Sequence, residues 1–397
     1  MKINVLNIDS IVDPVTGGGT GERTVQMSRF VQNAGAECTI LTLSTELTFS
    51  RASKLPGVTI EALPCLSKRF NIPKIGYRLI RRIVADADVI HLMGHWTVLN
   101  AVVYLFARQN KKPYVVCPAG ALPIFGRSRK LKKLYNILVG NRIIRNANAH
   151  VAITSEERLH FKPFGISADK VVVIPNGVDA SEFDERDDKS FRAKYGLSDL
   201  PIILFMGRLN PIKGPDLLLE SFCNLAGVLR DYQLIFAGPD NGMLGGLQNT
   251  VMKYGLGGQV RFLGYLGGRD KSMSYHAAEL LVVPSRQEAM SIVVLEAGIT
   301  GTPVLITDQC GFNEISVIKG GLVVPASVAG LENGLLAMLS DRESLQLMGS
   351  NLMEYVRKNF LWENVVNRYT QLYSGVVASK SKFRNVHVSK IGDSNAQ

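Results

Sequence analysis

Short runs of apolar, β-branched residues alternate along the chain with longer segments whose apolar positions recur every three or four residues. This alternation is typical of βαβ units, in which helices connect the strands of a parallel sheet. The first half contains six predicted strands, at 3–9, 38–43, 89–93, 113–118, 149–154 and 171–177. The second half contains six more, at 201–207, 232–238, 260–265, 279–285, 303–307 and 321–325. The pattern therefore predicts an α/β protein with two doubly wound parallel sheets of similar size.

The two predicted sheets imply two domains, because a single hydrophobic core rarely grows beyond roughly 250 to 300 residues and the chain has 397. We expect a first domain at 1–180, a polar and acidic linker at 181–198, and a second domain at 199–362. An amphipathic helix at about 363–379 is free to cross back onto the first domain. The tail at 380–397 has little apolar surface to bury, so it is predicted to be disordered.

The composition is that of a globular protein, with 46% hydrophobic and 20% charged residues. No apolar run reaches the roughly 18 residues that a membrane span needs. Asp9 and Asp13 interrupt the N-terminal segment where a signal peptide would be apolar, so we expect a cytoplasmic protein. The five cysteines are odd in number and widely spaced, which favours reduced thiols over disulfides or a zinc site.

Positive charge is concentrated in the first half. Residues 1–180 hold 24 Lys and Arg against 12 Asp and Glu, whereas residues 181–397 hold 21 against 22. The excess indicates an anionic partner, which could be nucleic acid, phospholipid head groups or a phosphorylated substrate. A basic amphipathic helix in this region suits the inner face of a membrane, although a solvated helix face would explain the pattern too. Its basic residues are Arg127, Arg129, Lys130, Lys132 and Lys133.

Ligands of open parallel sheets bind at the carboxyl ends of the strands, so the loops there are the first place to look for a site. After the first strand, "GGGTGE" leads into a helix and provides glycines and free amides for a phosphate; a plain turn is the alternative. After the first strand of the second half, Arg208 and Lys213 lie five residues apart between two glycines. The pair is suitable for the two phosphates of a diphosphate, and a solvated surface is the alternative.

The segment "SRQEAMSIVVLEA", residues 285–297, carries Glu288 and Glu296 on either side of an uncharged helix start. We expect the helix to begin near Met290. The free amides at its start would then face the same crevice as the two cations. These amides belong to Ala289, Met290, Ser291 and Ile292. A phosphate site flanked by two carboxylates describes a nucleotide sugar; a helix-start charge and a solvated glutamate would be the alternative.

Taken together, the motifs resemble glycosyltransferase family 4, whose members have the GT-B architecture of two Rossmann-like domains facing a central cleft. The resemblance covers about 375 residues and rests on ordered motifs: "GGGTGE", "HLMGHW", "ANAHVAITSEE", "VVVIPNGVD", "FMGRLNPIKG", "LIFAGPDNG", "VRFLGYL" and "PSRQEAMSIVVLEAGITGTPVL". Gly238, in the sixth of these, then joins the donor-binding set.

The resemblance implies a role for each candidate residue. Glu288 should contact the donor sugar at the reacting centre, and Glu296 should hydrogen-bond the ribose. Arg208 and Lys213 should neutralise the diphosphate, with Gly18 and Gly19 closing over it. His95 should lie on the acceptor side with a catalytic role, although packing against Trp96 would also explain it.

No metal or cofactor is expected. Asp86 to Asp88 read "DAD", like the metal-binding triplet of another glycosyltransferase fold, but here the triplet precedes a strand and is typical of a helix-to-strand turn. The resemblance implies retention of configuration through front-face attack, with the departing phosphate accepting the acceptor's proton.

The expected function is transfer of a hexose from GDP-mannose or a UDP-hexose to a saccharide acceptor. A polyprenyl-diphosphate-linked acceptor is preferred, in the synthesis of a cell-surface polysaccharide such as lipopolysaccharide. Two alternatives stay open at this point. One is a GT-B nucleotide-sugar epimerase, which would need acid and base groups at the sugar. The other is a basic nucleic-acid-binding protein, for which the sequence offers no recognition motif.

Overall fold

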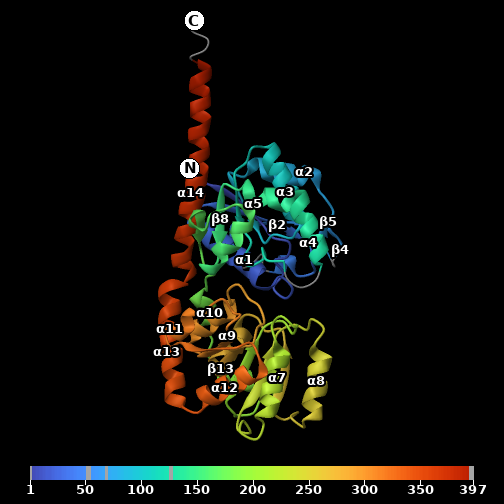
Figure 1. Cartoon of the computed structure of the whole chain (residues 1–397), viewed down its shortest axis with the longest axis vertical. Helices are drawn as coiled ribbons and strands as arrows, with labels where there is room; N and C mark the ends of the chain where they lie inside the picture. The colour runs from blue at the N-terminus through green and yellow to red at the C-terminus, as the bar shows by residue number, and fades with distance from the viewer. Residues whose placement is uncertain (1, 51–54, 68–69, 125–127, 393–397) are drawn as a thin grey trace. The chain divides into compact units, whose positions relative to one another are not determined.

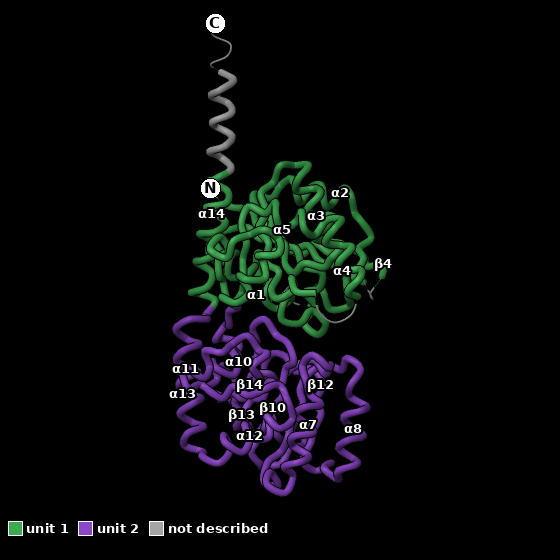
Figure 2. The backbone as a smooth tube through the Cα atoms, viewed as in Figure 1, with its two compact units in different colours: residues 1–175, 362–397 green, residues 176–361 purple. Residues whose placement is uncertain are grey.

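The computed structural model describes residues 2–50, 55–67, 70–124 and 128–392, with side chains up to Ser379 (Figure 1). The chain forms two compact units, coloured separately in Figure 2. Unit 1 consists of residues 1–175 and 362–397, and unit 2 of residues 176–361.

Unit 1 is built on a parallel sheet of seven strands in the order β3-β2-β1-β6-β7-β8-β9. The strands are β1 (Asn4–Ile8), β2 (Glu37–Leu43), β3 (Thr59–Leu63), β6 (Val89–Met93), β7 (Tyr114–Cys117), β8 (Ala149–Ala152) and β9 (Val171–Val173). A short antiparallel pair, β4 (Cys65–Ser67) and β5 (Ile72–Pro73), lies outside this sheet. All six strands predicted for this half are present, and β3 was not predicted.

Helices connect these strands and supply the other half of the unit 1 core. They are α1 (Gly18–Asn33), α2 (Tyr77–Asp86), α3 (Val98–Gln109), α4 (Arg129–Tyr135), the π-helical segment η2 (Asn136–Gly140), α5 (Asn141–Arg145), η3 (Glu156–Phe164) and η4 (Ala168–Lys170). Apolar side chains of the central strands and of α2 and α3 form one continuous buried cluster.

Unit 2 repeats the plan with a parallel sheet of six strands in the order β12-β11-β10-β13-β14-β15. The strands are β10 (Ile202–Met206), β11 (Gln233–Ala237), β12 (Val260–Gly264), β13 (Ala278–Val283), β14 (Val304–Thr307) and β15 (Gly321–Val324). The helices are η5 (Ala180–Phe183), α6 (Asp188–Tyr195), α7 (Pro215–Asn224), α8 (Leu244–Lys253), α9 (Arg269–Ala277), α10 (Ile292–Thr300), α11 (Glu314–Val317), α12 (Val328–Leu339) and α13 (Arg342–Asn359). Two doubly wound α/β domains are thus confirmed.

The polar stretch at 181–198, which the sequence suggests as a linker, lies inside unit 2 and is structured. It contains most of η5 and all of α6, and α6 packs on α9. The contact includes an ion pair at 2.7 Å between Lys194 and Asp270, so the polar residues here serve packing between two helices. The boundary between the units falls at 175/176 and 361/362.

The last helix, α14 (Trp362–Gly392), returns to unit 1, as predicted. Its buried residues repeat every three or four positions and lie against α1: Trp362, Val365, Val366, Tyr369, Tyr373 and Val376. Trp362 stacks on Phe30 of α1 with ring centroids 6.0 Å apart. The helix backbone continues to Gly392, past the predicted end at 379. Disorder of 380–397 stays a prediction, because the side chains from Lys380 and the backbone from 393 lie outside the described residues.

In both sheets the chain changes direction beside the first strand of the unit, at β1/β6 and at β10/β13. Crevices in open α/β sheets form at such switch points, outside the carboxyl ends of the strands. The loops that follow β1, β6, β10 and β13 are therefore the ones that position a site, and they carry most of the candidate residues.

Candidate functional site

The contact between Lys213 and Glu288 is the centre of the site in unit 2. Lys213 lies in the loop between β10 and α7, and Glu288 in the loop between β13 and α10. The lysine Nζ donates to Oε1 of the glutamate, which also accepts a hydrogen bond of 3.0 Å from the Ser285 hydroxyl. The Glu288 side chain is only 7% exposed and that of Lys213 27%. Two residues 75 positions apart in sequence are thus joined at adjacent strand ends.

Arg208 adds a second cation to the same loop. Its side chain is partly buried, and this burial lowers its pKa. Burial and then the positive charge of Arg208 lower the pKa of Lys213 to about 8. Because that pKa is still above 7, the lysine keeps most of its charge at pH 7. Two partly desolvated cations beside one carboxylate favour an additional anion, because the single carboxylate of Glu288 offsets only one of the two positive charges.

Glycines allow the strand ends to approach each other closely. Gly238, after β11, has φ +146°, and a Cβ there would lie 1.9 Å from the carbonyl oxygen of Gly207. Gly214, before α7, has φ +67°, and a Cβ there would lie 2.1 Å from the carbonyl oxygen of Pro284. Any side chain at either position would separate the loops that carry Arg208 and Lys213 from their neighbours. The predicted position Gly238 therefore has a clear structural reason to be glycine.

Helix α10 begins at Ile292, two residues later than predicted, with Ser291 as its N-cap. Ala289 and Met290 belong to the preceding loop. Met290 is 8% exposed, and its carbonyl accepts a hydrogen bond of 3.2 Å from Asn176. The Ser291 hydroxyl is buried, makes no capping bond, and has no partner among the described residues. A buried polar atom and the first helix amides are thus left for a ligand.

Glu296 lies on the second turn of α10 with a carboxylate held by two side chains of α9. Lys271 Nζ donates to Oε1 at 2.8 Å and the Tyr275 hydroxyl donates to Oε2 at 2.6 Å. Glu296 is 6% exposed, so it is not the solvated residue of the alternative interpretation. Burial and then the Glu296 carboxylate raise the pKa of Tyr275, which therefore stays a hydroxyl donor.

In unit 1, Gly18 and Gly19 form the start of α1, with Gly17 as the N-cap. Gly18 has φ +61°. Asp13 orders the loop before them, since its Oδ1 accepts hydrogen bonds from the amides of Val15 at 2.8 Å and Thr16 at 2.9 Å. The glycine loop is thus a fixed entry to a helix N-terminus, which suits an anion.

His95 follows β6 and is buried, with 2% exposure. Its Nε2 lies 2.9 Å from Oδ1 of Asn136, and its ring contacts Trp96, Tyr135 and Phe164 edge-on. Burial lowers its pKa to about 4, although the bond to Asn136 opposes this. A histidine with such a pKa is neutral at pH 7 and a weak proton acceptor. The geometry therefore favours packing and hydrogen bonding over general-base catalysis.

The predicted basic helix is α4, in which Arg129, Lys130 and Lys133 are exposed. Lys132 is half-buried, with its Nζ 5.6 Å from the Trp96 ring centroid, and burial lowers its pKa. Arg127 lies outside the described residues. Large apolar side chains are exposed on the same segment: Leu131 56%, Leu134 50%, Ile137 71% and Leu138 62%. We call the surface made by residues 129–138 the α4–η2 surface.

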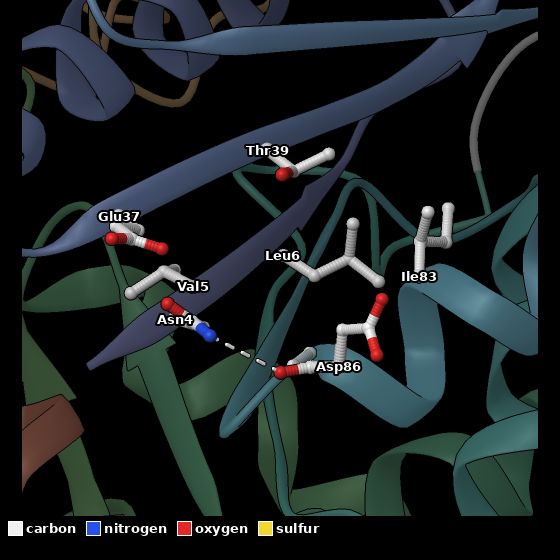
Figure 3. Close-up of a pocket in the computed structure, with 8 residues that line it drawn as sticks. Asn4, Val5, Leu6, Glu37, Thr39, Ile83 and Asp86 are labelled. Atoms are coloured by element: carbon white, nitrogen blue, oxygen red, sulfur yellow. Dashed lines mark hydrogen bonds between the residues drawn. The ribbon is translucent and has the colours of Figure 1, made fainter. Parts of the chain in front are cut away.

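The aspartates of the "DAD" string form the predicted helix-to-strand turn, since α2 ends at Asp86 and β6 begins at Val89. Oδ2 of Asp88 accepts a hydrogen bond of 2.9 Å from the backbone amide of Asn4. Asp86 lines a hollow of about 160 Å³ at the amino ends of β1 and β2, away from the strand ends discussed above (Figure 3). Across the part of the chain that the structure describes, no group of three or more His, Cys, Asp or Glu is arranged to hold a metal. Metal-independent chemistry stays a prediction.

The sequence does not single out Lys271, Tyr275, Ser285 or Asn176, although each contacts a predicted site residue. Lys271 and Tyr275 have the i, i+4 spacing that places two side chains on one helix face, which is a signal that could have linked them. Their partner Glu296 lies on another helix, so the contact depends on tertiary packing.

Comparison with known proteins identifies relatives for both units. The family model described as Glycosyltransferase Family 4 matches residues 17–182, and that described as Glycosyl transferases group 1 matches residues 187–354. A D-inositol 3-phosphate glycosyltransferase of Nocardia farcinica is 31% identical over 250 residues, which are 59% of this chain and 54% of that protein. This match thus spans about half the length of that relative.

Two solved structures have the same fold over almost the whole chain. Sucrose-phosphate synthase of Thermosynechococcus elongatus superposes with a TM-score of 0.76 at 21% identity, covering 95% of this chain and 100% of that one. HepE of Anabaena, solved in complex with UDP and glucose, superposes with a TM-score of 0.78 at 18% identity, covering 94% of this chain and 100% of that one.

Proposed function

The chain belongs to glycosyltransferase family 4 and has the GT-B fold, and from this premise we propose that it is a retaining enzyme that moves a hexose from a nucleotide sugar to a saccharide acceptor. The contact between Lys213 and Glu288 beside Arg208 carries the proposal. At this contact the two cations that could bind a leaving diphosphate lie beside the carboxylate that could contact the donor sugar. The epimerase and nucleic-acid alternatives have no comparable observation in their favour.

Cleavage of the donor C1–O bond leaves negative charge on the nucleoside diphosphate and an oxocarbenium-like sugar. Lys213 and Arg208 would stabilise the first charge, together with the amides at the start of α10. Such preorganised electrostatic stabilisation is usually the largest catalytic term. Glu288, released from part of its contact with Lys213 by the phosphate, would orient the sugar hydroxyls and stabilise its positive charge. The departing phosphate oxygen would accept the acceptor's proton, so that no covalent glycosyl-enzyme forms.

One observation supports a UDP-hexose donor over GDP-mannose: HepE, which shares the fold, was solved with UDP and glucose. The Glu296 carboxylate suits a ribose, which both kinds of donor contain. On the acceptor side, one relative is named for D-inositol 3-phosphate, and the excess positive charge of residues 1–180 suits an acceptor that is likewise anionic. No metal is part of the proposal.

The donor is identified by incubating the enzyme with UDP-, GDP- and ADP-hexoses and measuring the nucleoside diphosphate released. We expect release from one of them and loss of release in Glu288→Gln. Once a saccharide acceptor is added, the transferred sugar should keep its anomeric configuration by NMR. Isomerisation of the donor without release would favour the epimerase, and an inverted anomer would contradict the retaining mechanism.

We further propose that the α4–η2 surface contacts an anionic membrane, which would bring the enzyme to a polyprenyl-diphosphate-linked acceptor at the inner leaflet. Exposed Leu131 and Ile137 beside Lys130 and Lys133 combine the apolar and basic residues that interfacial helices use. No described helix is long and apolar enough to cross a bilayer.

Liposome sedimentation tests the surface. The double variant Lys130→Glu/Lys133→Glu should lose binding to vesicles with anionic lipid, because each basic residue contributes about 1 kcal/mol near such a surface. Lys253→Glu/Lys358→Glu is the matched control, since both lysines are exposed and lie in unit 2. Equal sedimentation with anionic and neutral vesicles, or with neither, would contradict membrane contact.

A further inference from the structure

The two donors that hold Glu296 come from one face of one helix. Lys271 and Tyr275 are four residues apart on α9, and their side chains bond to different oxygens of the same carboxylate, at 2.8 and 2.6 Å. Residues with this spacing are neighbours on a helix surface. The carboxylate is therefore held at both oxygens by a single rigid element, which fixes the rotation of its plane.

Packing in turn fixes the two donors. Tyr275 is fully buried, its ring lies 5.9 Å from that of Phe183, and its carbonyl accepts a hydrogen bond of 2.8 Å from the Thr302 hydroxyl. The Lys271 Nζ lies 5.2 Å from the Phe183 ring centroid, so the same aromatic residue supports both side chains. The Lys271 side chain is 19% exposed and that of Glu296 8%, so the ion pair sits just below the surface. We call Lys271, Tyr275 and Glu296 the α9–α10 clamp.

The clamp leaves Glu296 with accepting capacity. An ionised carboxylate offers about four lone-pair positions, and the two bonds to α9 use one on each oxygen. Each oxygen therefore keeps the capacity to accept one more bond, and the 8% of the side chain that stays exposed is the part that a ligand can reach. Two adjacent acceptors of this kind match a vicinal diol, whose two hydroxyls can each donate one bond.

We propose that Lys271, supported by Tyr275, is a positioning residue that holds the Glu296 carboxylate for the 2′- and 3′-hydroxyls of the donor ribose and so makes the enzyme selective for ribonucleotides. This inference rests on the proposed function, because it assigns a partner within the donor site. Lys271 acts through Glu296 and need not touch the nucleotide. A purely structural ion pair between α9 and α10 would instead affect folding and leave the choice of nucleotide unchanged.

Selectivity distinguishes the two roles. UDP, GDP and ADP are first titrated into the enzyme by calorimetry, and the tightest ligand is then compared with its 2′,3′-dideoxy analogue. Two hydrogen bonds to a charged group predict a preference of roughly 10²- to 10⁴-fold for the ribonucleotide. Lys271→Met should reduce this ratio to about threefold or less, because the carboxylate loses its counter-charge and its fixed orientation. Lys271→Arg keeps a positive charge at this position and should therefore keep most of the preference for the ribonucleotide.

A matched control breaks another ion pair of α9. Lys194→Met, on α6, removes the 2.7 Å ion pair with Asp270 of α9, next to Lys271 in sequence, without touching Glu296. It should keep the wild-type ratio. Tyr275→Phe keeps the ring and removes one hydrogen bond, so an intermediate ratio is expected, and a thermal melt of each variant checks that it is folded.

The outcomes separate the inference from the proposed function. If the folded Lys271→Met variant keeps the wild-type ratio, or weakens both ligands equally, the positioning role is wrong while the donor site stands. If the wild-type enzyme binds none of the three nucleoside diphosphates, the donor site itself is wrong and the inference falls with it.

Discussion

The two units have the same kind of sheet, but the polar groups at their strand ends are used differently. In unit 1 two acidic groups near the strand ends are paired within the protein: Asp9 accepts a bond of 2.8 Å from the Thr24 hydroxyl, and Glu157 accepts the amides of Gly120 and Ile153. In unit 2 the strand ends place two partly desolvated cations beside a single carboxylate. A shared topology therefore does not imply a shared role, and the strand ends of unit 2 carry the positive charge that suits a leaving diphosphate.

Burial explains why unit 1 needs internal partners. Arg23 of α1 is 1% exposed and donates to the Ile174 carbonyl at 2.7 Å and to the Tyr369 hydroxyl of α14. Burial raises the pKa of Asp9 to about 6, since its hydrogen bonds offset only part of the lost hydration. An isolated buried charge is costly, so these groups stabilise unit 1 only while their partners stay in place.

The largest effect is expected at Glu288. Glu288→Gln keeps the shape of the side chain but removes the charge that would stabilise the sugar, and kcat should fall by about 10²- to 10⁴-fold, as for other groups that act on the reacting centre. His95→Gln in unit 1 should cost less than about tenfold, because a buried ring whose pKa is lowered to about 4 is a weak proton acceptor near pH 7. Initial rates of donor cleavage measure both. Equal losses of kcat in the two variants would contradict the different roles proposed for the two units.

The next effect concerns the stability of unit 1. Arg23→Met leaves the Tyr369 hydroxyl and the Ile174 carbonyl without this partner, and should lower the free energy of unfolding by about 2–6 kcal/mol, because each buried group left unsatisfied costs about 1–3 kcal/mol. Arg82→Met is the control, because the Arg82 side chain is 63% exposed and its ion pair with Glu61 lies at the surface. Denaturant unfolding of both variants should show a shift for Arg23 alone. A similar denaturation midpoint for the two variants would mean that the hydrogen bonds of Arg23 contribute little to the stability of unit 1.

A smaller effect follows from pH. Because the pKa of Lys213 is about 8, the site loses a positive charge as the pH rises through that value. Affinity for a nucleoside diphosphate should therefore fall by about tenfold between pH 7 and pH 9, which corresponds to one proton. Lys213→Arg, whose guanidinium stays charged in this range, should show no such fall. A pH-independent affinity in the unaltered enzyme would contradict the proposed charge of Lys213.

Hydrophobic pattern predicts most of the fold. It locates twelve of the thirteen strands of the two large sheets, because buried parallel strands form continuous apolar runs. The exception, β3, lies at the sheet edge, and its residues are mostly half-exposed, so its apolar signal is weak. The segment at 181–198 is predicted as a linker because it is polar, but its helix α6 packs on α9 through polar contacts.

The site is predicted less completely. The loop motifs and the family resemblance single out Arg208, Lys213, Glu288 and Glu296 as candidates, because glycines and charges near strand ends leave a sequence signal. They do not reveal that Lys213 bonds directly to Glu288, or that α9 holds Glu296. Both contacts join segments far apart in sequence, 75 residues in the first case and 25 in the second. Such pairings follow from tertiary packing, which residue spacing alone does not specify.

Calorimetric titration of the enzyme and its Lys213→Met variant with the nucleoside diphosphate of the preferred donor tests the role of the unit 2 strand ends most directly. We expect binding to the unaltered enzyme and roughly 10- to 100-fold weaker binding to the variant, since a hydrogen bond to a charged group contributes about 1.5–3 kcal/mol. Lys194→Met, which removes a surface ion pair of the same unit, should bind like the unaltered enzyme. Equal affinity in all three proteins, or no binding to any, would contradict the claim that the unit 2 strand ends hold the donor diphosphate.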